Sequence, residues 1–113
     1  MIKGKIILVP FPFDDFSGIK VRPAICLTNE IGIYNHVIIA FISSQIPHSL
    51  EQSDLLIDKK DKNFKVTGLS VDSVIKLHRL VTIPKSLIKR QLGVLSLNQQ
   101  TEIDKKLKVL FEL

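Results

Sequence analysis

The chain has 113 residues, of which 45% are hydrophobic, and a formal net charge of +5 at pH 7. This length and apolar content predict one domain over residues 1–113 with a real core. The positive charge favours an anionic partner, such as nucleic acid, an acidic protein or an anionic membrane surface, or else marks a merely basic protein. The single cysteine, Cys26, excludes an internal disulfide and a thiolate zinc site, and its apolar surroundings predict a small core residue.

No apolar stretch approaches the roughly 20 residues of a membrane span, and the first residues carry no signal-peptide pattern. We therefore expect a cytoplasmic protein. The three histidines are scattered, with no pair at helical spacing, so a metal site is not expected and no cofactor is predicted. His36 and His48 lie beside turns and are interpreted as structural or exposed.

Short apolar runs separated by turn residues follow one another along most of the chain, which is typical of a small barrel of β-strands. Residues 37–42 are strongly β-branched and are expected to be buried on both faces of the sheet. Pro23 requires an edge or bulge position within its strand. The expected strands are 6–9, 20–27, 37–42, 54–57, 92–95, and the two runs 70–75 and 77–83, which form separate strands or one bent strand.

The C-terminal region predicts helical structure. Residues 84–88 indicate one helical turn with proline at its first position. Ser96 with Gln99 three residues later forms a capping box, the signature of a helix N-terminus. One apolar stripe follows and favours core or interface packing over a ligand site; it comprises Ile103, Leu107, Leu110 and Phe111.

A loop from Pro10 to about Gly18 carries three of the six phenylalanines, Phe11, Phe13 and Phe16. Aromatic rings stack on bases, and an arginine fork such as that of Arg22 binds phosphate. The combination points to a nucleic-acid ligand. In a small barrel, however, one or two of these rings are also expected to plug the core.

Several ordered motifs resemble the PemK/MazF-like toxins, which include Kid. The pattern GxIxLVxFPF over residues 4–13, then 17–18 (Ser-Gly) and 22–24 (Arg-Pro-Ala), resembles the N-terminal motif of the family. Residues 41–45 are similar to a family strand that ends in a hydroxyl residue and a glutamine. Residues 68–83 contain segments that resemble the later strand pair. The resemblance covers nearly the whole chain.

The resemblance implies a mainly β (α+β) fold, a small SH3-like barrel of the PemK/CcdB type with a C-terminal α-helix. It implies a homodimer and the toxin half of a toxin–antitoxin pair, with an acidic antitoxin as partner and DNA contacted only through the antitoxin complex. The implied activity is metal-independent, sequence-specific cleavage of single-stranded RNA, an mRNA interferase, by 2′-hydroxyl attack that leaves 2′,3′-cyclic phosphate and 5′-hydroxyl ends. Two alternatives stay open: a non-enzymatic topoisomerase inhibitor similar to CcdB, and a nucleic-acid-binding module of the same fold without cleavage.

Three residues are predicted to be catalytic. The family gives the position of Arg22 a catalytic role, and Pro23 restricts this arginine to extended backbone; the alternative is a surface ion pair with Asp14 or Asp15. Ser43 matches the hydroxyl position, although it would otherwise cap its own strand end, and Ser44 is the register-shifted alternative.

His78 stands where relatives carry Asp or Glu. A histidine can move protons near neutral pH but cannot pair with a guanidinium as a carboxylate does, and a surface histidine is the alternative. From Lys76 to Arg90 there are five cations and no acid, which predicts a basic patch. The predicted RNA-binding residues are Phe11, Phe13, Phe16, Lys20, Ser44, Gln45, Lys76 and Arg79.

Overall fold

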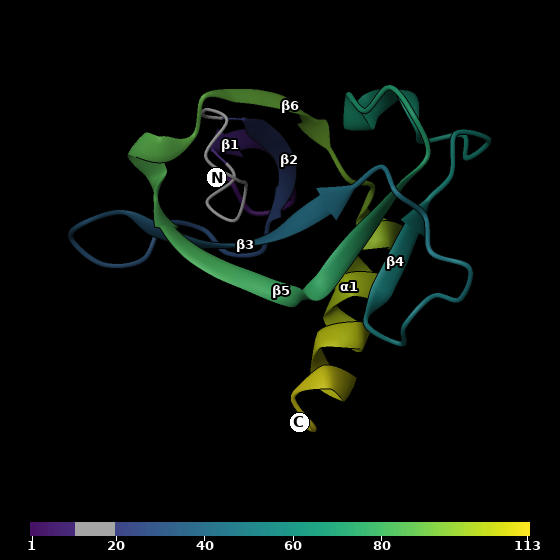
Figure 1. Cartoon of the computed structure of the whole chain (residues 1–113). Coiled ribbons are helices and arrows are strands. Elements are labelled where there is room, and N and C mark those ends of the chain that lie inside the picture. The colour runs from purple at the N-terminus through teal and green to yellow at the C-terminus, as the bar shows by residue number, and fades with distance from the viewer. Residues whose placement is uncertain (11–19) are drawn as a thin grey trace.

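A computed structural model describes residues 1–10 and 20–113 (Figure 1). The predicted RNA contacts Phe11, Phe13 and Phe16 lie outside the described residues, as do Asp14 and Asp15, the alternative partners of Arg22. The described strands are β1 (Lys5–Pro10), β2 (Val21–Cys26), β3 (His36–Ser43), β4 (Asp54–Ile57), β5 (Ser73–Pro84) and β6 (Arg90–Val94), and the helices are the 3₁₀ turns η1 (Lys65–Thr67) and η2 (Lys85–Leu87) and the α-helix α1 (Leu97–Leu110).

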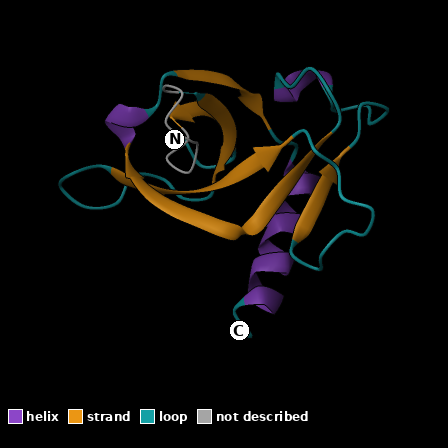
Figure 2. Cartoon of the chain, viewed as in Figure 1, coloured by secondary structure: helices purple, strands orange, loops and turns teal. Residues whose placement is uncertain are grey.

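The strands form one antiparallel sheet in the order β4-β5-β3-β2-β1-β6. The sheet curls into a half-barrel, with β5 and β6 on opposite sides of the curve and α1 as the only long helix of the described chain (Figures 1 and 2). This is the mainly β architecture with a C-terminal helix that the sequence predicted, and the expected strands are confirmed within a few residues at their ends.

The central strands β1 and β3 are largely buried on both faces of the sheet, which explains why their sequences are nearly continuous apolar runs. On one face Ile6, Ile25 and Ile75 pack with Ile103 of α1. On the other face Ile7, Cys26 and their neighbours form a second cluster. The predicted core position of Cys26 is confirmed, and burial, with a smaller contribution from the negative charge of Glu30, raises the pKa of its thiol to about 11.

The predicted capping box is present at the start of α1. Ser96 Oγ accepts the backbone N–H of Gln99 at 3.2 Å, and the Gln99 side chain accepts the N–H of Ser96 at 3.1 Å. The apolar stripe packs as expected through Ile103 and the half-buried Leu107 and Leu110. Phe111 is the residue that caps the C-terminus of α1 and is 55% exposed, so it does not pack in the core of this chain, and a place in an interface stays a prediction.

The two runs 70–75 and 77–83 are one bent strand, β5. Its pairing with β3 jumps from Leu80 opposite Ala40 to Ile75 opposite Ile42. Residues 76–79 therefore oppose a single residue of β3, and a bulge of this kind bends its strand. Figure 1 shows the resulting corner in β5.

Turn η1 was not predicted from the sequence. It lies against β6, where the glycines allow backbone to approach backbone. A Cβ on Gly93 would lie 2.2 Å from the carbonyl oxygen of Val66, and one on Gly68, whose φ is +74°, would lie 2.2 Å from that of Leu92. This close approach covers part of the edge strand β6.

Candidate nucleic-acid interface

A cavity of about 480 Å³ opens where β2 and β3 stop pairing. The last bridge between these strands joins Ala24 to Phe41. If the same register continued, Arg22 would stand opposite Ser43. The strands stop pairing before these residues instead, and both residues line the cavity. The sheet thus brings together the arginine and the hydroxyl that the sequence placed 21 residues apart.

Pro23 explains why the strands part at this point. Leu27 donates its N–H to Ile38 of β3, and Cys26 accepts the N–H of Gly4 beside β1. Because alternate residues of a strand point their backbone groups to opposite sides, the nitrogen of Pro23 faces β3, where it has no hydrogen to donate. Pro23 was expected at an edge or a bulge, and it lies at a local edge: β2 is an interior strand, but at Pro23 it pairs only with β1.

The corner of β5 supplies two more cations to the cavity. Lys76 and Arg79 both line it, one at each end of the bulged segment, and the approach to β5 contributes the wall at Leu69–Val71. Among the described residues the lining holds three cations and no acid, with four serine hydroxyls. Such a hollow has the charge and the hydrogen-bond donors to bind a phosphate group.

Ser43 has a defined hydrogen-bonding state at the cavity. Its Oγ accepts the backbone N–H of Gln45 at 3.1 Å, which is the strand-end capping that was the alternative to a functional role. Because a hydroxyl both accepts and donates, this bond leaves its hydrogen available to donate. Capping and a contact with an anion are therefore compatible. Ser44 and Gln45 also line the cavity.

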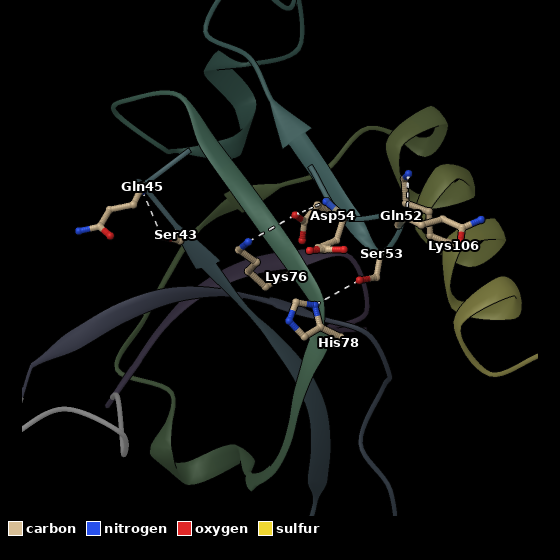
Figure 3. A network of polar contacts seen from close by, with 9 residues as sticks. Ser43, Gln45, Gln52, Ser53, Asp54, Lys76, His78 and Lys106 are labelled. Atoms are coloured by element: carbon tan, nitrogen blue, oxygen red, sulfur yellow. Dashed lines mark hydrogen bonds and ion pairs between the residues drawn. The ribbon is translucent and has the colours of Figure 1, made fainter. Parts of the chain in front are cut away.

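His78 does not lie at this cavity. It lines a separate hollow of about 360 Å³ between α1 and the start of β4, and its Nδ1 lies 3.2 Å from Ser53 Oγ (Figure 3). Because the bulge changes which way the side chains of β5 face, His78 lies on the side of the sheet that carries α1. The sequence pattern did not predict this orientation. The structure thus does not bring His78 together with Arg22 and Ser43. Lys20 is exposed just before β2 and is not part of the cavity lining.

The five cations between Lys76 and Arg90 do not form one unpaired patch. Lys76 pairs with Asp54 at 3.3 Å, and Lys85 pairs with Glu30 at 3.0 Å. Lys85 is also the main reason that the pKa of Glu30 is lowered. Both acids are distant in sequence, so only the folded chain reveals the pairs.

Asp54 is the residue near the site that sequence reasoning missed. Its side chain is fully buried and stands directly across from Lys76 in the β4–β5 pair. The available signal was an acidic residue at the start of an otherwise apolar strand, and this does not indicate a partner 22 residues away.

Among the described residues no group of three or more His, Cys, Asp or Glu could hold a metal ion. The described helices include none that is long and apolar enough to cross a membrane.

The model of one protein family matches nearly the whole chain. This family is described as the PemK-like, MazF-like toxin of type II toxin-antitoxin systems, and the match spans residues 2–111. A comparison with curated proteins finds no match.

Three solved structures illustrate the likeness in fold. The Mycobacterium tuberculosis toxin MazF-mt6 has a TM-score of 0.73 at 23% identity, covering 96% of this chain and 97% of that one. An endoribonuclease in complex with its cognate antitoxin, from a mycobacterial species, has a TM-score of 0.72 at 12% identity, covering 100% and 96%. MazE-MazF from Deinococcus radiodurans has a TM-score of 0.71 at 17% identity, covering 100% and 97%.

Proposed function

The chain belongs to the PemK-like, MazF-like toxins of type II toxin–antitoxin systems, and from this premise we propose that it is a metal-independent, sequence-specific endoribonuclease that cuts single-stranded RNA. The observation that carries the proposal is the cavity that Arg22 and Ser43 line together with Lys76 and Arg79. RNA brings its own nucleophile, the 2′-hydroxyl beside the scissile phosphate. Its attack on phosphorus forms the cyclic phosphate and breaks the bond to the 5′-oxygen, and the proton lost by the 2′-hydroxyl is balanced by the proton that the 5′-oxygen gains. The protein has to align the attack and stabilise the negative charge that develops on the non-bridging oxygens.

In the proposed reaction Arg22 binds the non-bridging oxygens of the scissile phosphate. Its guanidinium can form two parallel hydrogen bonds, and these strengthen as negative charge grows in the transition state. Pro23 keeps the backbone of Arg22 extended, and the adjacent bridge between Val9 and Arg22 ties this residue to β1. The arginine is therefore carried by a paired strand on one side and borders the cavity on the other.

Ser43 acts in this proposal as a hydrogen-bond donor to the same phosphate. The Gln45 N–H already occupies one acceptor site of its oxygen, so its hydrogen can be given to a phosphate oxygen. Ser44 and Gln45 border the same hollow and are proposed to contact the neighbouring nucleotides. His78 lines another hollow, and we assign it no catalytic step.

We also propose that the toxin forms a homodimer and is inhibited by an acidic antitoxin. Two of the similar structures are, by their descriptions, an endoribonuclease in complex with its cognate antitoxin and a MazE-MazF structure. The net charge of +5 and the three cations at the cavity make an acidic segment the matching partner.

The test is cleavage of a long RNA of mixed sequence by the purified protein in EDTA. We expect cuts at one short sequence, with 2′,3′-cyclic phosphate and 5′-hydroxyl ends identified by end mapping. Arg22→Ala should slow cleavage by about 100-fold or more, the usual effect of removing a group that stabilises transition-state charge.

An intact fold must accompany that loss, so the thermal unfolding of Arg22→Ala is measured beside the wild type. Cleavage that stops in EDTA would contradict the metal-independent mechanism. RNA left intact while DNA supercoiling is inhibited would replace the proposal with a topoisomerase inhibitor.

A further inference from the structure

A buried ion pair lies beside the proposed RNA site (Figure 3). Asp54 of β4 and Lys76 of β5 are cross-strand partners, with 3.3 Å between Lys76 Nζ and Asp54 Oδ2. The carboxylate is fully buried, whereas the lysine side chain is 20% exposed and borders the cavity. The same Oδ2 accepts the backbone N–H of Glu51 at 2.9 Å. The carboxylate is thus held in place, and of the two partners only Lys76 lines the cavity.

The hydrogen bond from Glu51 explains an acceptor at the turn before β4, but stability does not explain why this acceptor is a buried charge paired with a lysine. Asp54 Oδ1 is buried and has no hydrogen-bond partner among the described residues, and an unsatisfied buried acceptor is unfavourable. A buried ion pair is often no more stable than an apolar pair of the same volume.

A position at the cavity does explain the pair. A lysine side chain is long and flexible, and fixing it on a ligand has a cost in rotamer entropy. An acidic partner in the protein already restricts the lysine rotamers before the ligand binds, so less rotamer entropy is lost on binding. The ammonium has three hydrogens to donate, so one can remain on Asp54 while another contacts a phosphate.

We propose that Asp54 is a positioning residue that holds Lys76 at the cavity as a fixed cation for a phosphate of the bound RNA. This inference rests on the proposed function and adds to it a residue that does not itself touch the substrate. The effect is on binding, because the pair is formed in the free protein and is not created in the transition state.

Because Asp54 is negatively charged, the two explanations predict opposite changes in RNA affinity when it is replaced. Asp54→Asn removes a negative charge near a polyanion site, which by Coulomb's law alone should tighten RNA binding. If Asp54 positions Lys76, the same change weakens binding instead. Glu30→Gln is the matched control, because Glu30 also pairs with a lysine, Lys85, but neither residue borders the cavity.

The experiment measures binding of a 2′-O-methyl RNA oligonucleotide that spans the mapped cleavage sequence and lacks the nucleophile. We expect Asp54→Asn to weaken binding about 3- to 10-fold, in the range of one charged contact partly lost. Lys76→Met should weaken it by a similar factor and lower the slope of log K against log salt by about 0.7, one phosphate contact on a single strand. In the Lys76→Met background, Asp54→Asn should cause no further weakening, and Glu30→Gln should leave binding unchanged or slightly tighter.

Binding by Asp54→Asn that equals or exceeds wild-type binding overturns the inference, as does equal weakening in both backgrounds. A wild type that neither binds nor cuts RNA overturns the proposed function as well, so the two failures are distinguishable. If Asp54→Asn does not fold, lysine acetylation of the wild type followed by mass spectrometry decides. The oligonucleotide should protect Lys76 and not Lys85, and unchanged Lys76 reactivity would overturn the inference.

Discussion

The two ends of the β2–β3 pair differ in a way that separates stability from function. At the paired end, Ala24–Cys26 bridges Ile39–Phe41 and all six residues are buried. At the open end, Val21–Pro23 and Ser43–Gln45 diverge, and most of their side chains reach solvent or the cavity. One proline that cannot donate toward β3 marks the change. The comparison teaches that a site can arise where a sheet stops, without a separate loop to hold it.

The largest expected effect belongs to the paired end and concerns stability. Ile25 is 1% exposed and packs among Ile6, Ala40 and Leu77. Ile25→Ala should lower the free energy of unfolding by about 2–5 kcal/mol, because it leaves a cavity in the core. Chemical denaturation measures this change.

Val21→Ala is the matched truncation at the open end, where the side chain is 42% exposed. It should change the free energy of unfolding by no more than about 0.5 kcal/mol. Equal decreases in the free energy of unfolding at the two positions would contradict the comparison, since both ends of the strand pair would then contribute equally to stability.

A smaller effect is expected from the hydroxyl at the open end. Ser43→Ala should slow RNA cleavage by about 10- to 100-fold, toward the lower range for removing a single donor to the reacting group. Its unfolding midpoint should hardly move, because only the hydrogen bond from the Gln45 N–H is lost. Single-turnover cleavage with saturating enzyme isolates the chemical step.

Ser44→Ala serves as the control for that measurement, and it decides between the two adjacent hydroxyls. Ser43 is the one that would stand opposite Arg22 if the β2–β3 register continued beyond its last bridge, Ala24 to Phe41. A larger loss in Ser44→Ala than in Ser43→Ala would assign the role to the neighbouring hydroxyl.

The smallest effect is expected at His78. Its ring contacts Ser53 at a different hollow, so His78→Ala should change the rate of RNA cleavage by less than about threefold, a difference of under 1 kcal/mol. The pH profile of cleavage should also keep its shape. A large loss, or a lost acidic limb of the profile, would restore the catalytic role that the sequence suggested.

Much of the fold could be predicted from residue patterns. β-branched runs located the strands because strand propensity and burial act together, and the hydrogen bonds of the Ser96 capping box are local. Pro23 was correctly expected at an interrupted position. The bent form of β5 was left open between one strand and two, since a bulge depends on the partner strand and leaves little trace in its own sequence.

In the candidate site, too, some features follow from local sequence and others only from the tertiary structure. The sequence by itself determined which chemical groups are present: a guanidinium before a proline, a hydroxyl at a strand end, and a surplus of positive charge. Only the tertiary structure decided which of them meet. The end of the β2–β3 pairing left Arg22 and Ser43 at one cavity, the corner of β5 placed Lys76 at that cavity and His78 at a separate hollow, and β4 brought a buried carboxylate to Lys76. The physical reason is that composition and local pattern fix short-range preferences, whereas strand register joins residues far apart in the chain and shifts every side chain when it moves by one position.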